Sequence, residues 1–113
     1  AQRLVRRNCP LCAAEEDIDP AIREILGVGR DEVFYRGRGC DHCNRTGYSG
    51  RMAVYELLRI TPAIRALIQP GMTADAVHAQ AVKDGMVPLT RTALTAARDR
   101  RTSLAEVYRV RLE

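Results

Sequence analysis

Four cysteines arranged as two C-x-x-C pairs are the residues of this 113-residue chain with the clearest capacity for chemistry. Cys9 and Cys12 form the first pair, and Cys40 and Cys43 form the second after 27 intervening residues. A C-x-x-C turn presents two thiolates on one side of the chain, and two such turns supply the four ligands of a tetrahedral zinc ion. The sequence therefore predicts one structural zinc bound by all four cysteines.

The gap between the pairs exceeds the roughly 15 to 20 residues of the commonest zinc pattern. A predicted helix within the loop accounts for the excess, because Asp19 can cap it, Pro20 suits its first turn and Gly27 can end it. A closed set of four sulfurs leaves zinc no open position for water, so the metal is expected to stabilise rather than catalyse. The nearby cations expected to offset the thiolate charge are Arg7, Arg38, Arg45 and Arg51.

Disulfide and redox interpretations of the cysteines stay open. The first residues, AQRLVRRNC, lack the apolar segment of an export signal, which favours a reducing compartment where structural disulfides seldom persist. Thioredoxin-type catalysis uses one C-x-x-C at a helix start, whereas Pro10 and Gly39 favour tight turns here. A redox switch, in which oxidation releases the metal, is compatible with any four-thiolate site. His42, between two cysteines, is expected to be exposed rather than a ligand.

Composition constrains the partners. The formal net charge is +4, which permits a zinc-ribbon nucleic-acid binder, but aromatic residues on which bases stack make up only 4% of the chain. We therefore expect no nucleic-acid partner. No apolar run approaches the roughly 18 residues of a membrane span.

Several catalytic motifs are missing from the sequence. A phosphate-binding P-loop requires a lysine beside Ser or Thr after a glycine-rich turn, whereas the single lysine, Lys83, precedes Asp84 in a predicted helix. His42 and His78 have no carboxylate or nucleophile at a useful spacing, and His78 is expected on a helix surface. We therefore expect no catalytic residue in the chain and no nucleotide hydrolysis by it alone.

The predicted fold is mostly α with a small β element. Residues 1–12 are interpreted as the tail of a preceding element, and the β-prone runs 33–35 and 52–55 are expected to form one small sheet. The layout predicts a tetracysteine zinc-binding subdomain over residues 1–60 and a helical subdomain over residues 61–113.

Four helices are predicted in the second segment. Thr61 caps the first, with Ile64, Leu67 and Ile68 on one face. Thr73 caps the second helix, Gly85 ends it, and Val77 and Ala81 are expected to face inward. The third helix starts near Pro88, and a stripe of alanines along it allows close packing. A capping box predicts the start of the last helix: the side chains of Ser103 and Glu106 each accept a hydrogen bond from the other's backbone amide. The inner face of this helix is expected to hold Leu104, Val107 and Tyr108.

Four segments of the chain resemble the C-terminal region of the type II secretion and type IV pilus assembly ATPases. They read AQRLVRRNCPLC, GCDHCNRTGYSGRMAVYELL, DGMVPL and TSLAEVYRV, and the similarity spans nearly the whole chain. The resemblance implies that Cys9, Cys12, Cys40 and Cys43 are zinc ligands. It also implies a fragment of a RecA-like secretion ATPase whose P-loop and magnesium-binding residues lie upstream, so that ATP and Mg²⁺ bind only the parent chain.

By this resemblance, the parent is a cytoplasmic hexameric motor, held at the inner membrane through its partners, that drives pseudopilus assembly in type II secretion. The alternative is a type IV pilus assembly ATPase, because the motifs are shared. The implied partners are the upstream ATPase core, the neighbouring subunits of the hexamer and the inner-membrane platform protein.

Two details of the resemblance make structural predictions. The family usually has a glycine before the T-S cap of the last helix, where Arg100 and Arg101 stand here, so the turn must accept arginine or be reshaped. In the matching G-Y-x-G-R stretch, both glycines are expected at positive φ and Tyr48 as a lid. Arg51 is expected to pair with Glu56.

Overall fold

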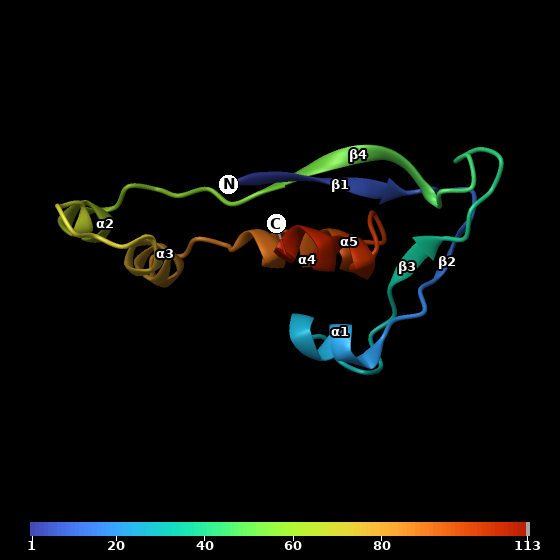
Figure 1. Ribbon diagram of the computed structural model, residues 1–113, viewed down its shortest axis with the longest axis horizontal. Helices are drawn as coiled ribbons and strands as arrows, with labels where there is room; N and C mark the ends of the chain where they lie inside the picture. Colours follow the sequence, from blue (N-terminus) through green and yellow to red (C-terminus); the bar gives the residue numbers. More distant parts are fainter. Residues whose placement is uncertain (113) are drawn as a thin grey trace.

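Two antiparallel strand pairs and five helices make up the described part of the chain, residues 1–112, in the computed structural model (Figure 1). The fold is therefore small and α+β; the expected RecA-like parent stays a prediction. In chain order the elements are β1 (Gln2–Asn8), β2 (Ala13–Glu15), α1 (Pro20–Leu26), β3 (Tyr35–Gly37), β4 (Tyr48–Tyr55), α2 (Pro62–Leu67), α3 (Ala74–Lys83), α4 (Leu89–Arg98) and α5 (Leu104–Leu112).

The strands form two sheets whose pairing differs from the prediction. Residues 33–35 and 52–55 do not pair with each other: Tyr35 begins β3, which pairs with β2, and 52–55 belong to β4, which pairs with β1. Residues 2–8, interpreted as the tail of another element, are themselves a strand. Their helix-forming residues give no sign of this, because strand preference depends on the partner strand more than on local propensity.

The apolar core lies between the β1–β4 sheet and helices α4 and α5, and α1 packs against its side. The predicted alanine stripe of α4 is confirmed, since Ala93, Ala96 and Ala97 are at most 1% exposed and let the helix approach its neighbours closely. Buried residues come from both sides of residue 60, and the division into 1–60 and 61–113 stays a prediction whose last residue, 113, lies outside the described residues. The core side chains are Val5, Val28, Phe34, Val54, Ala93, Leu94, Ala97, Leu104, Val107 and Val110.

Helix boundaries follow the predicted caps. The side chains of Asp19, Thr61 and Thr73 accept hydrogen bonds from the first-turn amides of α1, α2 and α3. Gly27, at φ 68°, ends α1 in the left-handed conformation. Ile68, expected on the inner face of α2, is instead 51% exposed. The helix ends at Leu67, and Ile68 is its C-cap, with an extended backbone that no longer follows the helix.

Only half of the capping box predicted for α5 forms. Ser103 Oγ accepts from the amide of Glu106 at 3.2 Å, as predicted. The Glu106 carboxylate does not return to Ser103; it accepts the backbone amide of Arg6 at 2.8 Å and the guanidinium groups of Arg6 and Arg109. A long-range partner therefore displaces the local one. Tyr108, expected on the inner face of α5, is only partly buried, whereas Val110 is buried.

Helices α2 and α3 lie at one end of the molecule, away from the β2–β3 sheet (Figure 1), and pack against each other. Ala81 of α3 is buried, and Val77 is partly so. His78 is exposed, as predicted. Among residues 1–112, no helix has the length and apolar character needed to cross a bilayer.

Candidate metal centre

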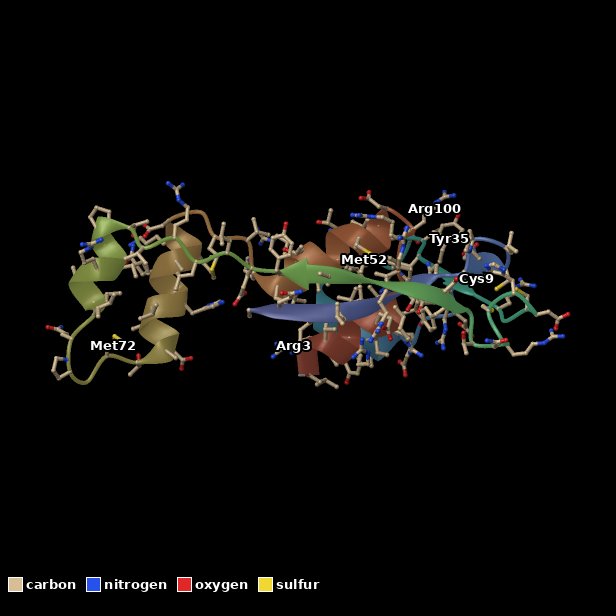
Figure 2. The ribbon with its side chains drawn as sticks, turned by 90° about the horizontal axis from the view of Figure 1, so that it is seen from above. Arg3, Cys9, Tyr35, Met52, Met72 and Arg100 are labelled. Atoms are coloured by element: carbon tan, nitrogen blue, oxygen red, sulfur yellow. The ribbon has the colours of Figure 1, made fainter. Side chains whose placement is uncertain are left out.

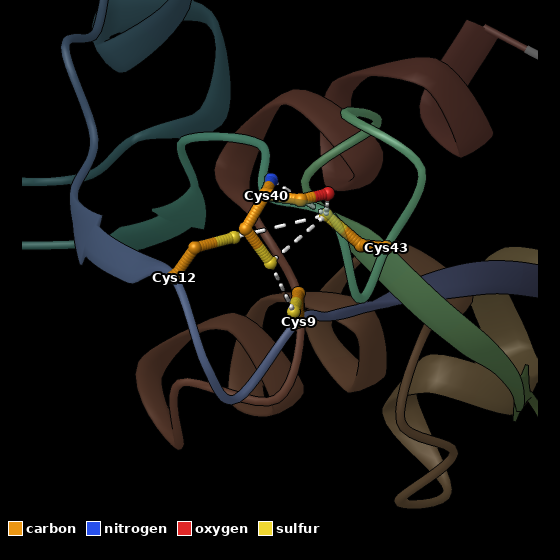
Figure 3. A group of neighbouring side chains, drawn as sticks. All are labelled: Cys9, Cys12, Cys40 and Cys43. Carbon is orange, nitrogen blue, oxygen red and sulfur yellow. Dashed lines mark hydrogen bonds between the residues drawn. The ribbon is translucent and has the colours of Figure 1, made fainter.

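The four cysteines come together in one cluster (Figure 3), and Figure 2 shows Cys9 at the opposite end of the molecule from Met72, which lies between α2 and α3. Cys9 directly follows β1, Cys12 directly precedes β2, and Cys40 and Cys43 lie in the loop between β3 and β4. The two strand pairs thus bring the two C-x-x-C turns face to face. All four sulfur atoms lie within 4.8 Å of one another.

The spacing of the sulfurs fits a tetrahedral metal. The Sγ atoms of Cys9 and Cys40 are 3.8 Å apart, those of Cys12 and Cys43 are also 3.8 Å apart, and those of Cys40 and Cys43 are 3.7 Å apart. Zinc bound to sulfur at about 2.3 Å in a tetrahedron separates its ligand atoms by about 3.8 Å. The predicted clustering is confirmed, and all four thiols are free; their role as zinc ligands stays a prediction. His42 lies outside the cluster and is exposed, as predicted.

Backbone amides point at the sulfurs, as they do in metal-binding turns. Gly39 donates to Cys12 Sγ at 3.3 Å, and Cys40 and Gly47 each donate to Cys43 Sγ at 3.2 Å. Burial by itself raises the pKa of the Cys43 thiol, but hydrogen bonds from these two amides and from the side chains of Cys40 and Cys12 outweigh it and bring the pKa down to about 6. Burial raises the pKa of Cys12 to about 11. Hydrogen bonding to the ionised sulfur thus prepares Cys43 to act as a thiolate ligand.

Glycine is required where the two ends of the loop that carries Cys40 and Cys43 meet. Gly37 and Gly47 lie so close that a Cβ on either would collide with the carbonyl oxygen of the other. Gly47 is at φ 82° and its carbonyl accepts the amide of Cys9 at 3.0 Å, which ties the second cysteine loop to the end of β1. The contact between the glycines therefore closes the base of the second cysteine loop, and the bond from Cys9 holds that loop against the first pair.

Asn8 connects this centre to the body of the molecule. Its Nδ2 donates to the carbonyls of Tyr35 at 2.8 Å and Arg100 at 3.1 Å, and its backbone amide donates to Arg101. Arg100 stands at φ 65°, the left-handed conformation that glycine favours, and its guanidinium lies 4.2 Å from the Tyr35 ring centroid. Figure 2 shows Tyr35, Arg100 and Cys9 at the same end of the molecule.

Sequence reasoning missed the role of Asn8. The one signal available was a short amide side chain directly before a cysteine of the predicted site. Its carbonyl partners in the 35 and 100 regions could not be found without the fold.

Tyr48 is the first residue of β4, directly after the second cysteine loop, and its side chain is buried. The guanidinium of Arg6 lies 4.1 Å from its ring centroid, and its hydroxyl is 2.6 Å from Ser103 Oγ. The predicted pair between Arg51 and Glu56 is wrong. Glu56 instead accepts the amide of Leu89 at 2.9 Å, and Arg51 makes no ion pair within residues 1–112. The positive φ predicted for both glycines of this stretch is confirmed.

Comparison with known proteins identifies the family. A family model described as "Type II/IV secretion system protein" matches residues 1–109. The chain belongs to this family. Type II/IV secretion proteins with similar sequences include the type IV pilus assembly ATPase PilB of Thermus thermophilus, 39% identical over 95% of this chain and 12% of that protein.

Relatives from type II secretion match to a similar degree. The type II secretion system protein E of Aeromonas hydrophila and the type II secretion system ATPase E of Vibrio cholerae are each 36% identical over all of this chain and 23% of their own length. The resemblance stated from the sequence is thereby confirmed. The chain spans between about an eighth and a quarter of the length of these three type II/IV secretion relatives.

Proposed function

We propose that this chain is the zinc-stabilised structural and interaction module of a cytoplasmic secretion-motor ATPase that powers type II protein secretion through pseudopilus assembly. The observation that carries the proposal is the cluster of four free thiols with the spacing of a tetrahedral site, in a chain of the type II/IV secretion family. Cys9, Cys12, Cys40 and Cys43 would hold zinc, which would cross-link the two loops and supply no reaction chemistry.

ATP and Mg²⁺ belong to the parent chain in this proposal. Several relatives are named as ATPases, and they are four to eight times longer than this chain. Lys83, the single lysine, lies exposed at the end of α3 beside Asp84, where no glycine-rich turn surrounds it. The module would act by contact, on the ATPase core, on neighbouring subunits of a hexamer and on the platform protein at the inner membrane.

Exposed apolar residues support a role in contacts. Leu11, between the first two cysteines, is 70% exposed at the tip of its turn. Ile68 and Met72, in the α2–α3 connection, are more than half exposed at the other end of the molecule. Both ends of the chain's long axis thus offer apolar side chains to partners.

Assembly of a type IV pilus is the second candidate function. The relative from Thermus thermophilus, which is named as a pilus assembly ATPase, is 39% identical to this chain, against 36% for the two type II secretion relatives described above. The cysteine centre serves both candidates equally.

Replacing two cysteines in the full-length chain tests the proposal. We expect a Cys9→Ser, Cys43→Ser variant to lose zinc and to fail in secretion, because the two cysteine turns are no longer joined. His42→Ala, in the second pair but outside the cluster, is the matched control and should keep both. Unchanged zinc content in the double variant would contradict the metal assignment, and normal secretion without zinc would contradict the structural role. Failure of piliation instead of exoprotein export would select the second candidate.

A further inference from the structure

Asn8 is a buried polar residue at the junction between β1 and the cysteine centre. It is the last residue of β1, directly before Cys9, and it is 8% exposed. Gln2, Leu4 and Arg6, which precede it at the same alternation along the strand, are exposed. The register with β4 shifts by one residue between Arg6 and Asn8, and such a bulge bends the strands and re-aims a side chain. The side chain of Asn8 is therefore turned into the protein.

The carboxamide of Asn8 forms hydrogen bonds through one of its two ends. Its Nδ2 donates to the carbonyl of Tyr35 at 2.8 Å and to that of Arg100 at 3.1 Å. Within residues 1–112, the buried Oδ1 has no hydrogen-bond partner. A buried polar atom without a partner is unfavourable, and an apolar side chain of similar size would avoid that cost if Asn8 only filled space. The two donor bonds therefore explain why an amide stands at this position.

The two carbonyls belong to segments that are far apart in the sequence. Tyr35 is the first residue of β3, the strand that leads to Cys40, and Arg100 lies in the turn between α4 and α5. The guanidinium of Arg100 also lies over the Tyr35 ring, and Figure 2 shows both residues at the end of the molecule that holds Cys9. Asn8 thus ties the strand before the first cysteine pair to the strand before the second pair and to the helical part of the chain.

Cys9 depends on this junction more than Cys12 does. Cys12 directly precedes β2, and its carbonyl accepts the amide of Arg38 at 3.0 Å beside the β2–β3 pair. The pairing of β1 with β4 ends at Asn8, so Cys9 lies one residue beyond it. The position of Cys9 is therefore set by the bond from its own amide to the Gly47 carbonyl at 3.0 Å and by the bonds that hold Asn8.

We infer that Asn8 is a positioning residue of the metal centre, whose two donor bonds hold Cys9 at the distance from the second cysteine pair that a tetrahedral ion requires. This inference rests on the proposed function, which supplies the metal. The Sγ atoms of Cys9 and Cys40 are 3.8 Å apart, as around a tetrahedral zinc. The carboxamide bonds to backbone carbonyls and not to a sulfur, so it acts on the ligand through the backbone. A ligand held in place before the metal arrives binds it more tightly.

Zinc affinity of the full-length chain, measured by competition with a chelator, tests the role of Asn8. Asn8→Asp keeps the shape but places an oxygen against two carbonyls, and Asn8→Ala removes the carboxamide without adding charge. We expect the affinity to fall about 100-fold in Asn8→Asp and about tenfold in Asn8→Ala, the range typical of residues that support metal ligands. Asn44→Asp is the matched control, because it adds the same charge directly after Cys43 at an exposed site, and it should keep the wild-type affinity.

Cobalt(II), which can occupy the same site, separates positioning from general stability. Its visible absorption depends on the geometry of the ligand atoms around it. We expect the spectrum of cobalt added to the metal-free, full-length chain to change in Asn8→Ala. Leu104→Ala, which opens a cavity in the core, should keep the wild-type spectrum and affinity.

Two results would overturn the positioning role. One is wild-type metal affinity and cobalt spectrum in Asn8→Ala, which decides alone if the charge in Asn8→Asp prevents folding. The other is an equal loss of affinity in Leu104→Ala, because general destabilisation would then account for the effect. A wild-type chain that takes up neither zinc nor cobalt would instead contradict the proposed function.

Discussion

The apolar core and the cysteine end reach their order by different means. Between the β1–β4 sheet and α5, Val5, Leu104 and Val107 are fully buried, and their removal from water stabilises the packing. Residues 37–47 contain no Val, Leu, Ile, Met, Phe, Tyr or Trp, and what they bury is Gly37, Cys43 and Gly47. The comparison teaches that a cross-link must replace apolar burial at the cysteine end, which is the physical reason why we expect a metal there.

Removing the metal should give the largest difference in stability between the apolar core and the cysteine end. We expect a strong chelator to unfold residues 37–47 while the core around α5 stays protected, because structural zinc contributes about 10 kcal/mol or more in zinc-finger peptides. Hydrogen exchange with and without chelator measures both regions in one sample. Simultaneous loss of both regions, or no change in either, would contradict the comparison.

Gly47→Ala should destabilise the cysteine end by straining its backbone. The new Cβ collides with the carbonyl of Gly37, and the residue stands at φ 82°, so we expect the free energy of unfolding to fall by about 4 kcal/mol. Gly27→Ala is the matched control, since Gly27 has a positive φ but nothing within 4 Å, and it should cost about 1 kcal/mol. Denaturant unfolding gives both values. Equal losses would show that the contact with Gly37 is unimportant.

Leu104→Ala should act on the core and leave metal affinity unchanged. Leu104 is fully buried, so the cavity should cost about 3 kcal/mol. Leu112 lies in the same helix but is 64% exposed, so Leu112→Ala should lower the free energy of unfolding by no more than about 0.5 kcal/mol. Chemical denaturation and zinc titration of both variants check this. A drop in zinc affinity for Leu104→Ala alone would mean that the two regions are coupled.

The ion pairs of Glu106 and Glu32 give the smallest expected differences. Glu106 is 1% exposed and Arg6 and Arg109 bind it, so Glu106→Gln should cost about 2 kcal/mol. Glu32 pairs with Arg98 at a more exposed site, so Glu32→Gln should lower the free energy of unfolding by less than about 1 kcal/mol. Unfolding midpoints compare them, and an equal cost would contradict the importance of burial.

The same carboxylate predicts a pH dependence. Burial opposes ionisation of Glu106, but hydrogen bonds from Arg109 and Arg6 outweigh it and lower the pKa to about 2 from an ordinary value of 4.5. A lowered folded-state pKa stabilises the fold above pH 4.5, and this contribution is lost as pH falls from 4.5 toward 2. Stability measured over this range should fall more steeply for the wild type than for Glu106→Gln.

Local signals in the sequence predicted local structure well. The caps at Asp19, Thr61 and Thr73 and the left-handed Gly27 depend on neighbouring residues alone, and all form. The clustering of the cysteines was also predictable, because C-x-x-C pairs are a signal of shared ligands that does not require the fold.

Long-range contacts could not be predicted. Glu106 was assigned to its own helix end, but β1, a hundred residues earlier, supplies a charged partner and a free amide together. Residues 2–8 were not recognised as a strand because their partner, β4, lies beyond the whole cysteine loop. Both errors came from interactions between segments that are distant in sequence, where tertiary context overrides local preference.

Zinc content combined with X-ray absorption at the zinc edge tests the central claim most directly. Protein purified without added metal should contain about one zinc per chain, with four sulfur ligands at about 2.3 Å. Metal-free protein that keeps residues 37–47 ordered, or zinc bound by oxygen or nitrogen in place of sulfur, would contradict the account.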